Sequence, residues 1–474
     1  MAKKQKLELT WIGKDDEVHL EPRVLIENTE LSYGDKDTGN MIIHGDNLLA
    51  LKALEQDYAG KVKCIYIDPP YNTGNAFEHY DDGLEHSIWL SLMKKRLEYL
   101  KNLLKQDGSI YVQIDDVEMA YLKVIMDEVF GRNNFVTSIC IQMSHLSGVK
   151  MSHVEKKPPK IKEFILIYSK NKVAFSVKPV FTAATWKESL DRYTQIVVNF
   201  DDPINEWKSL SMGKYIQEIV KKDFTEVDKE KFLIKNSYRI FRTARNRSLE
   251  ATGIKNIFSE ILTKRGLSKI ILNDEEVLFA GEKIKEIDGV VTPFKILGDI
   301  WTDIGINNLH KEGQIDFRNG KKPEKLISRI IEMSSNVGDL ILDSFLGSGT
   351  TAAVAHKMNR KYIGIELGDH ATTHSVPRLQ SVIDGLDTSG ISKILNWQGG
   401  GGFNFYTLAP SLLKKDKFDN WIIEPSYDAN LLASALAKQE AFTYHPDSEV
   451  FWKQGHSTEN DFIFTTTQFI TVEL

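Results

Sequence analysis

Four consecutive residues place the parts of a group-transfer site in one short turn: Asp68, Pro69, Pro70 and Tyr71. The apolar run at 62–67 before them predicts a buried strand, so Asp68 should lie at its carboxyl end, where open α/β sheets bind ligands. An exocyclic amine on a nucleobase is a poor nucleophile, because its lone pair is delocalised into the ring. Two acceptors on the NH2 group, the Asp68 carboxylate and the Pro69 carbonyl that successive prolines hold rigidly, would aim that lone pair outward. Tyr71 would offer a face for a flipped base, although an ordinary Pro-Pro turn is the structural alternative.

A second stretch could hold a nucleotide-like cofactor. A strand-like run at 340–343 leads into a glycine-rich turn, a helical pattern at 352–358 and a second strand at 361–365. Glu366 follows Gly347 by 366 − 347 = 19 residues, the spacing at which an acid binds ribose hydroxyls. No Lys follows Gly349, which disfavours a phosphate-binding loop of the NTPase type. The residues that we expect beside the cofactor are Asp343, Phe345, Gly347, Gly349, Thr350, Thr351 and Glu366.

The Asp-Pro-Pro-Tyr turn resembles the catalytic motif of the amino-methyltransferases, which methylate adenine N6 or cytosine N4 in DNA. This resemblance implies S-adenosylmethionine as the cofactor and a mechanism without a metal. It also implies that Asp46 lies at the adenine end of the cofactor and that Lys322 and Pro323 lie beside it. The structural alternatives are a helix N-cap for Asp46 and the first helical position for Pro323.

The order of the two motifs indicates the subclass. Asp68 precedes Asp343 by 343 − 68 = 275 residues, and this circularly permuted order resembles the beta class of these enzymes. The fold implied is α/β: a doubly wound, Rossmann-like methyltransferase sheet with an inserted target-recognition domain. We expect an N-terminal extension (1–40), a catalytic half (41–172), the recognition domain (173–297), a cofactor-binding half (298–408) and an acidic C-terminal region (409–474).

The middle of the chain is the candidate DNA-binding region. Between residues 150 and 269 there are 25 Lys and Arg against 14 Asp and Glu, an excess of +11, whereas residues 400–474 carry 5 against 10. Four arginines are interleaved with aromatic residues, which suits phosphate and base-edge contacts, although a solvated surface gives the same pattern. These arginines are Arg239, Arg242, Arg245 and Arg247. The polar loop at 144–162 is long for a plain connection, and we expect it near the DNA.

Several short stretches resemble the modification subunit of type III restriction–modification systems: residues 6–9, 44–47 and 71–75, and the Pro158-Pro159 loop. The resemblance implies adenine methylation in double-stranded DNA, a homodimer and a restriction subunit as partner. An Asp at the first position of the catalytic motif favours adenine, since the cytosine enzymes of the family mostly carry Ser there. Cytosine-N4 methylation and a non-catalytic DNA-binding specificity subunit remain the alternatives.

Composition agrees with an ordinary protein of two to four domains. The 474 residues are 42% hydrophobic and 27% charged, with a net charge of −6. No apolar run has membrane length, and the two cysteines, Cys64 and Cys140, suit a reducing compartment, so we expect a cytoplasmic protein without membrane contacts. Four glycines at 399–402 predict either a flexible linker or a bend into the strand at 403–406. Further strands are expected at 41–43, 109–114, 135–141, 164–168 and 469–472, and a helix is expected at 86–105, ended by a turn at 106–108.

Overall fold

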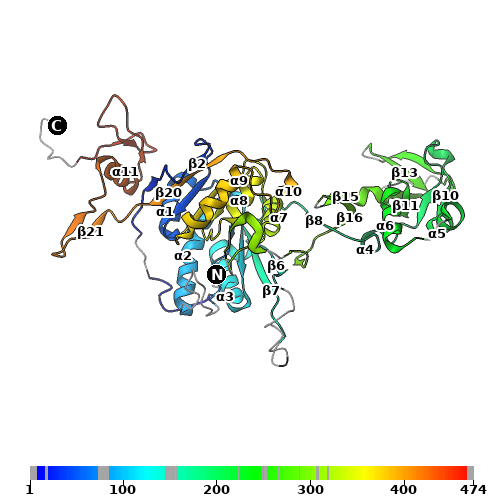
Figure 1. Cartoon of the computed structure of the whole chain (residues 1–474), viewed down its shortest axis with the longest axis horizontal. Coiled ribbons are helices and arrows are strands. Elements are labelled where there is room, and N and C mark those ends of the chain that lie inside the picture. Colours follow the sequence, from blue (N-terminus) through cyan, green and yellow to red (C-terminus); the bar gives the residue numbers. More distant parts are fainter. Residues whose placement is uncertain are drawn as a thin grey trace, which may run out of the picture. The chain divides into compact units, whose positions relative to one another are not determined.

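The computed structural model describes residues 8–16, 20–72, 85–144, 155, 158–221, 224–247, 249, 253–263, 266–287, 289–305, 309–317 and 320–466. The chain divides into two compact units, which we call unit 1 (Met1–Lys178 with Asp299–Leu474) and unit 2 (Pro179–Gly298). Many elements of both units are labelled in Figure 1. Residues 73–75, most of the loop at 144–162 and a strand expected at 469–472 lie outside the described residues.

Unit 1 is built on a mixed sheet that has eleven strands within the described residues. Its order is β1 (Leu25–Glu27), β20 (Gly402–Leu408), β3 (Met41–His44), β19 (Lys361–Glu366), β18 (Leu340–Asp343), β4 (Val62–Ile67), β5 (Leu104–Ile114), β7 (Lys162–Ser169), β6 (Phe135–Gln142) and β17 (Ile300–Trp301), with β2 (Tyr33–Gly34) on β20. Strands β20, β3, β19, β18, β4 and β5 run parallel to one another. Strand β7 is antiparallel to both β5 and β6, and β1 is antiparallel to β20.

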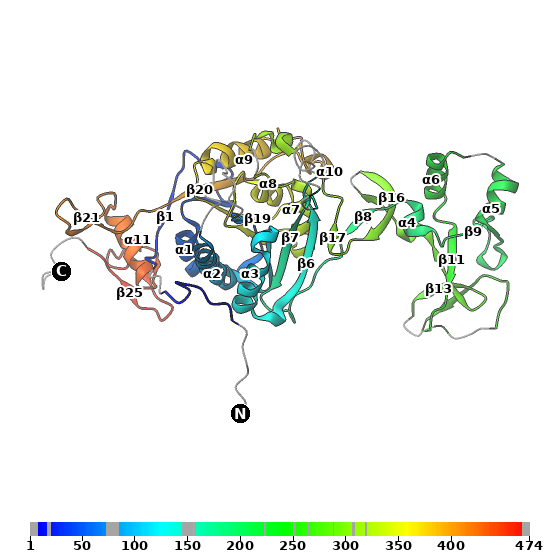
Figure 2. The ribbon, with the colours of Figure 1, turned by 90° about the horizontal axis from the view of Figure 1, so that it is seen from below.

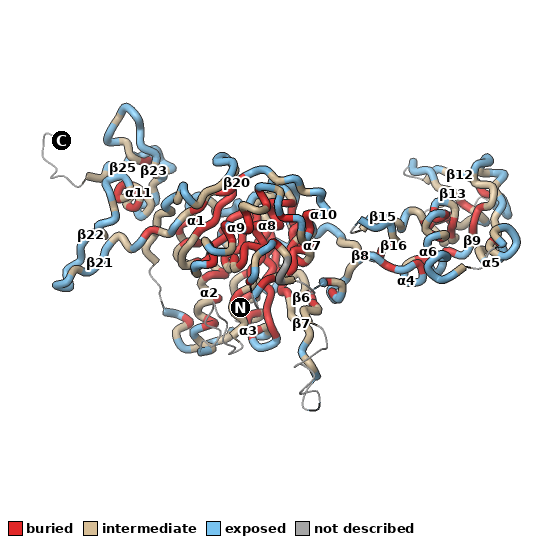
Figure 3. Tube along the Cα trace, in the orientation of Figure 1, coloured by how far each residue is buried: buried red, intermediate tan, exposed pale blue. Residues whose placement is uncertain are grey.

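The parallel strands lie in the centre of the unit because their residues are almost all apolar. A parallel strand is covered on both faces, so its sequence is a continuous hydrophobic run. Strand β4 is the example: Cys64, Ile65, Tyr66 and Ile67 are each at most 1% exposed. Figure 3 shows the buried residues gathered along the centre of unit 1. The strands expected at 41–43, 62–67, 340–343 and 361–365 are all present, so the sequence pattern located the sheet core.

Helices cover both faces of this sheet. On one face the core contains apolar side chains of α1 (Asn47–Tyr58), α2 (His86–Leu103) and α3 (Asp116–Met126). The other face carries α7 (Glu324–Ser334), α8 (Thr350–Lys357) and α9 (Val376–Ile383), as Figure 2 shows. The chain passes from β4 through α2 to β5 and from β18 through α8 to β19, in opposite directions along the sheet. Right-handed crossovers in opposite directions place their helices on opposite faces.

Two local predictions are refined by the structure. The predicted helix at 86–105 ends at Leu103, and Leu104 already pairs with Val62, after which the register shifts so that Cys64 pairs with Ser109. The expected turn at 106–108 is therefore an irregularity within β5. The glycines before β20 form a bend, since Gly399, Gly400 and Gly401 have φ values of 93°, 104° and 81°, and β20 then pairs with β1 and β3.

The C-terminal part of unit 1 contains small antiparallel sheets and one helix. These elements are β21 (Leu413–Lys415), β22 (Trp421–Ile423), α11 (Ala429–Gln439), β23 (Thr443–Tyr444), β24 (Gly455–His456) and β25 (Phe462–Ile463). Ser411 and the Leu412 backbone N–H both donate to Glu21, which ties this part to the N-terminal segment. In the described part of the chain, every helix is too short or too polar to cross a membrane.

Unit 2 has its own cores. Its six-stranded antiparallel sheet has the order β10 (Ser209–Ser211), β9 (Gln195–Val197), β11 (Ile240–Ala244), β14 (Glu275–Phe279), β13 (Ser268–Leu272) and β12 (Ser259–Leu262). A second sheet contains β15 (Ile284–Ile287), β16 (Val290–Ile296) and β8 (Phe181–Ala183), and the helices are α4 (Trp186–Leu190), α5 (Met212–Tyr215) and α6 (Glu226–Lys235). Ile196 and Ile240 belong to one apolar cluster and Val197 and Phe241 to another, so alternate residues of β9 and β11 face opposite sides.

Candidate active site at the carboxyl ends of the parallel strands

Acidic residues line one edge of the central sheet. Strands β3, β19, β18 and β4 are parallel neighbours, so their carboxyl ends meet at this edge. Asp46 follows β3, Glu366 and Asp343 end β19 and β18, and Asp68 follows β4. The direction of the crossovers reverses between β18 and β4, which is the switch point where open α/β sheets bind ligands. The two motifs that lie 275 residues apart in the sequence therefore end side by side.

Asp68 lies within a four-residue polar cluster that we call the Asp68 cluster: Asp68, Tyr71, Glu163 and Lys322. The Tyr71 hydroxyl oxygen is 2.6 Å from Asp68 Oδ1 and 2.8 Å from Glu163 Oε2. Lys322 Nζ is 2.8 Å from Asp68 Oδ2, donates to the Tyr71 oxygen at 3.0 Å and lies 3.8 Å from Glu163. The three charged side chains are 13–20% exposed, so the ion pairs are largely shielded from water.

These contacts set the charges of the two carboxyl groups in different ways. Burial, together with the neighbouring Glu163, raises the pKa of Asp68 against the opposing effect of Lys322. Burial also raises the pKa of Glu163, but Lys322 and hydrogen bonds from Gln113 and Tyr71 outweigh it, so the net pKa lies below its usual value. The pKa of Lys322 is raised, because attraction to both carboxylates outweighs burial. Lys322 is therefore a fixed cation between two acidic side chains.

Hydrogen bonds from α2 and β5 hold the turn that carries Asp68 and the side chains around it. The Trp89 indole N–H of α2 donates to the Pro70 carbonyl at 2.8 Å, and Trp89 is fully buried. Gln113 of β5 donates to Glu163 and accepts from the Tyr66 hydroxyl at 2.6 Å. A buried chain of hydrogen bonds thus fixes the side chains that face the reacting position, as pre-organised sites require.

Three of these residues were not identified from the sequence: Trp89, Gln113 and Glu163. Trp89 lies on a predicted helix and Gln113 in a predicted strand, where neither carries a motif. Glu163 stands just before the strand predicted at 164–168. Because β7 is antiparallel to β5, the beginning of β7 lies beside the carboxyl end of β5, and only this pairing brings Glu163 to the site.

The glycine-rich turn after β18 is held by two carboxylates. Asp343 accepts from the Phe345 N–H at 2.9 Å and from the Thr351 hydroxyl at 2.5 Å, and its burial raises its pKa to about 7. Glu366 accepts from the Gly347 N–H at 2.7 Å, and Gly347 and Gly349 have φ values of 57° and 77°. Glycine adopts such values with less strain than residues that carry a Cβ, which favours glycine at both positions.

Glu366 is itself tightly held. It accepts from the Gly368 N–H at 3.0 Å and pairs with His370 at 2.9 Å, and it is 3% exposed. Burial raises the pKa of Glu366, but His370 and the two backbone N–H groups outweigh it and hold the pKa below its usual value. The carboxyl end of β19 therefore carries a fixed anion.

Asp46 is the N-cap of α1, which was the structural alternative for this residue. Its Oδ1 accepts from the Leu48 and Leu49 N–H groups, which makes it the N-cap of α1, and its Oδ2 is 3.2 Å from Arg96. Arg96 also donates to Asn47, whose amide donates to the Ser344 carbonyl at 2.7 Å. This chain connects the turn after β3 to the glycine-rich turn after β18.

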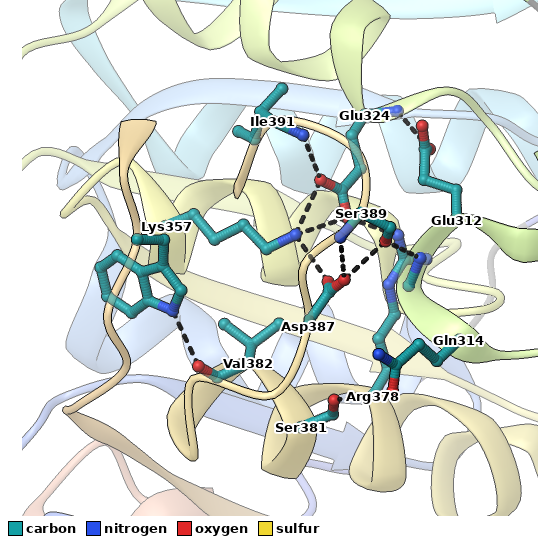
Figure 4. A network of polar contacts seen from close by, with 12 residues as sticks. Glu312, Gln314, Glu324, Lys357, Arg378, Ser381, Val382, Asp387, Ser389 and Ile391 are labelled. Carbon is teal, nitrogen blue, oxygen red and sulfur yellow. Dashed lines mark hydrogen bonds and ion pairs between the residues drawn. The ribbon is translucent and has the colours of Figure 1, made fainter. Parts of the chain in front are cut away.

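A buried ionic network, drawn in Figure 4, supports the glycine-rich turn that follows β18. Glu324 accepts from Lys357 at 2.8 and 2.9 Å and from Arg378 at 2.9 Å, and Lys357 also contacts Asp387 at 2.7 Å. The side chains of all four are 0% exposed. Arg378 donates to the Thr350 hydroxyl at 2.7 Å, so the network ends at the first helical residue after the glycine-rich turn. Lys322 and Pro323 come directly before Glu324, which joins the network to the Asp68 cluster.

The predicted DNA-contacting arginines lie on β11 and the segment after it in unit 2. Arg239 donates to Asn236 at 2.6 Å and to the Tyr215 hydroxyl at 3.0 Å, and Arg242 lies over the Tyr193 ring. Arg245 and Arg247 are exposed. The first two arginines therefore make contacts within unit 2, and the last two present their side chains to solvent.

An acidic edge beside a glycine-rich turn at a switch point is the ligand-binding arrangement of open α/β enzymes, and comparison with known proteins identifies the family. The chain belongs to the DNA methylase family of N6 and N4 enzymes, whose sequence model matches residues 62–376. It is 40% identical over 405 residues to the "Probable type III restriction-modification enzyme HindVI Mod subunit" of Haemophilus influenzae, a match covering 78% of this chain and 54% of that protein. It is 24% identical to the EcoP15I Mod subunit of Escherichia coli, over 91% of this chain and 77% of that one. The chain thus spans about half the length of the HindVI relative.

A solved structure with a related arrangement is that of the PvuII DNA methyltransferase (cytosine-N4-specific). It is 14% identical, with a TM-score of 0.39, and the match covers 77% of this chain and 98% of that one.

The charges at the strand ends fit the cofactor of this family, S-adenosylmethionine. Four carboxyl groups lie along the edge, where Arg96 pairs with Asp46, Lys322 with Asp68 and His370 with Glu366. Such an edge suits a ligand with a positive sulfonium and ammonium group, and it would repel a polyphosphate. The positive φ values of the glycine-rich turn allow a ligand to approach the backbone closely.

Proposed function

We propose that this chain transfers a methyl group from S-adenosylmethionine to adenine N6 in duplex DNA at a specific site. The observation that carries the proposal is the position of Asp68, held by Lys322 and Tyr71 at the switch point beside Asp343. In this proposal unit 1 is a doubly wound, circularly permuted methyltransferase core. Membership of the DNA methylase family and the identity to Mod subunits support it.

Each group of the turn has a defined part in the reaction. Both Asp68 oxygens are already hydrogen-bonded, but each has a second lone pair with which to accept from a base amine. The Pro69 carbonyl supplies the second acceptor, and the Trp89 contact to Pro70 keeps that carbonyl in place. Bound S-adenosylmethionine supplies an electrophilic methyl group on a sulfonium. Asp68 and Pro69 orient the amine toward it and stabilise the positive charge that develops on the nitrogen.

Adenine is the favoured base because the first residue of the turn is an aspartate. An ionised acceptor makes a stronger hydrogen bond than a hydroxyl, and adenine N6 can profit from it. In cytosine the ring nitrogen beside the amine is more basic, so a carboxylate there risks binding the protonated, unreactive base. Cytosine-N4 methylation is the alternative outcome of the experiment below.

We infer that the remaining regions serve recognition and assembly. Residues 173–297, which include most of unit 2, would read the target sequence, with Arg245 and Arg247 as exposed candidates for DNA contacts. The flanking parts, 41–172 and 298–408, would be the catalytic and cofactor-binding halves, between an N-terminal extension (1–40) and an acidic region (409–474). By similarity to proteins named as Mod subunits of type III restriction-modification enzymes, one partner would be a restriction subunit. A second copy of the chain and a cytoplasmic location belong to the same proposal.

The test is transfer of labelled methyl groups from S-adenosylmethionine to mixed duplex DNA, followed by digestion to nucleosides and mass spectrometry. We expect N6-methyladenine from the wild type and none from Asp68→Ala, with cofactor affinity retained by calorimetry. Asp107→Ala is the matched control, since Asp107 pairs with Lys63 outside the site and its loss should not affect transfer. Mainly N4-methylcytosine would correct the base, and full activity of Asp68→Ala would refute the mechanism. DNA binding without any transfer would favour the non-catalytic specificity subunit.

A further inference from the structure

The Tyr71 hydroxyl bridges two carboxyl groups but has only one proton to donate. Its oxygen lies 2.6 Å from Asp68 and 2.8 Å from Glu163, both within hydrogen-bonding distance. If both carboxyl groups were ionised, one of these contacts would join two oxygens without a proton between them. Lys322 already donates to the same Tyr71 oxygen, so it cannot supply the missing proton to that contact.

We propose that Asp68 and Glu163 share a second proton through the Tyr71 hydroxyl, and that Glu163 receives the proton released by the target amine. This inference rests on the proposed methyl transfer and adds the path by which the proton leaves. Glu163 touches no reacting atom and acts through Tyr71.

The proposed step balances once the shared proton has left from Glu163 to water, because Asp68 and Glu163 are then both carboxylates and Tyr71 is a neutral phenol. The methylated amine carries a positive charge, its N–H bond breaks, and the proton forms an O–H bond on Asp68. Asp68 then gives this proton to the Tyr71 oxygen while the Tyr71 hydroxyl gives its own proton to Glu163. Tyr71 ends as a neutral phenol, Asp68 as a carboxylate and Glu163 as a carboxylic acid. Nothing is oxidised or reduced.

The surroundings of Glu163 suit the end of such a path. Its side chain is 20% exposed, so it can release the proton to water. Hydrogen bonds from Gln113 and the nearby Lys322 keep the pKa of Glu163 low despite its burial, which favours this release. The higher pKa of Asp68 suits a group that takes the first proton from the amine.

Other charged or titratable groups face this pair from neighbouring elements, and each keeps its place in the variants below. They are Tyr66 of β4, Lys160 before β7, Lys322 before α7 and Asp343 of β18. Asp343 requires a control of its own, because its pKa of about 7 leaves it protonated in mild acid.

The first test is infrared spectroscopy of the full chain without ligands, at about pH 5.5, where an ordinary aspartate is ionised. A carbonyl band of protonated carboxyl groups is expected, and the parts due to Asp343 and Glu312, whose pKa values burial raises, are assigned with Asp343→Asn and Glu312→Gln. The remaining band should be lost in Glu163→Gln, because removing one anion lets Asp68 ionise. A remaining band that Glu163→Gln leaves unchanged would overturn the inference, as would its absence from the wild type.

The second test is the pH dependence of kcat for methyl transfer. Asp68 must be ionised to accept from the amine, so activity falls on the acid side, and Glu163→Gln should move this fall to lower pH by about one to two pH units. Tyr71→Phe should lower kcat with cofactor affinity unchanged. The matched control is Tyr168→Phe, since Tyr168 donates to Asp127 at 2.7 Å from the same strand as Glu163. If kcat of Glu163→Gln fell at the same acidic pH as kcat of the wild type, the shared proton would be overturned. A wild type without transfer would refute the proposed function, and the infrared result would still decide the inference.

Discussion

Lys357→Met tests the buried network that supports the glycine-rich turn. Lys357 donates three charge-assisted hydrogen bonds, two to Glu324 and one to Asp387, at 2.7–2.9 Å. All three side chains are 0% exposed, so methionine fills the space of the stem but leaves two buried anions with one cation, Arg378. Breaking a buried ion pair in this way costs about 3–5 kcal/mol.

That cost can be converted into a change of melting temperature. Unit 1 has roughly 350 residues, and an unfolding entropy of ~2.1 cal/mol/K per residue turns 3–5 kcal/mol into a decrease of about 4–7 °C. The assay is thermal unfolding followed by circular dichroism and by calorimetry. Lys361→Met is the control, because Lys361 lies exposed on β19, and its melting temperature should change little.

A double variant separates charge from packing. Lys357 holds the pKa of Asp387 below its usual value against the effect of burial. Lys357→Met with Asp387→Asn leaves Glu324 paired with Arg378 and no uncompensated anion, so it should be more stable than Lys357→Met alone. The reasoning would be refuted if the double variant were no more stable, or if Lys357→Met melted together with the Lys361→Met control.

Three further predictions concern the cofactor turn, the recognition region and pH. Gly349→Val should abolish cofactor binding, measured by calorimetry, since Gly349 has a φ of 77° and a Cβ there would lie 3.1–3.2 Å from Ser375. The control is Gly338→Val: Gly338 has a φ of 82° and open space around it, so this change should strain the backbone equally and leave cofactor binding intact. Exchanging residues 179–298 for the matching region of a related enzyme should change the methylated sequence, read by genome-wide mapping, and an unchanged site would place recognition elsewhere. The folded-state pKa of Asp343, about 7, lies above its unfolded value, so Asp343 favours folding only at low pH and its contribution is lost as pH rises toward 7. Asp343→Asn should therefore gain stability relative to the wild type between about pH 4 and pH 7, and parallel stability curves would contradict the raised pKa.

Local patterns in the sequence were sufficient to locate the two motifs. A short apolar run that ends in Asp-Pro-Pro fixes a strand end, because prolines cannot continue a central strand, and β4 ends at Ile67 as expected. The glycine-rich turn was equally readable, since Gly347 and Gly349 adopt a conformation that other residues avoid. These signals depend on the conformational preferences of neighbouring residues, and the sequence therefore contains them directly.

No strand pattern in the sequence predicted the sheets of unit 2. Its strands are three to seven residues long, too short for a clear alternation of apolar and polar residues, so the six-stranded antiparallel sheet could not be predicted. The role of the arginines also needed the fold. Arg239 contacts Tyr215 across unit 2, a pairing that the spacing of basic residues does not contain.

The sequence by itself determined the chemistry of each motif, the order of the motifs and the strands that carry them. The tertiary structure alone decided that β4 and β18 are neighbours, which brings Asp68 and Asp343 to one switch point. It also decided that Lys322 pairs with Asp68 and that the antiparallel β7 brings Glu163 to Tyr71. The physical reason is that strand order and direction arise from burying the apolar faces of the whole sheet. That global condition is not written in any single segment.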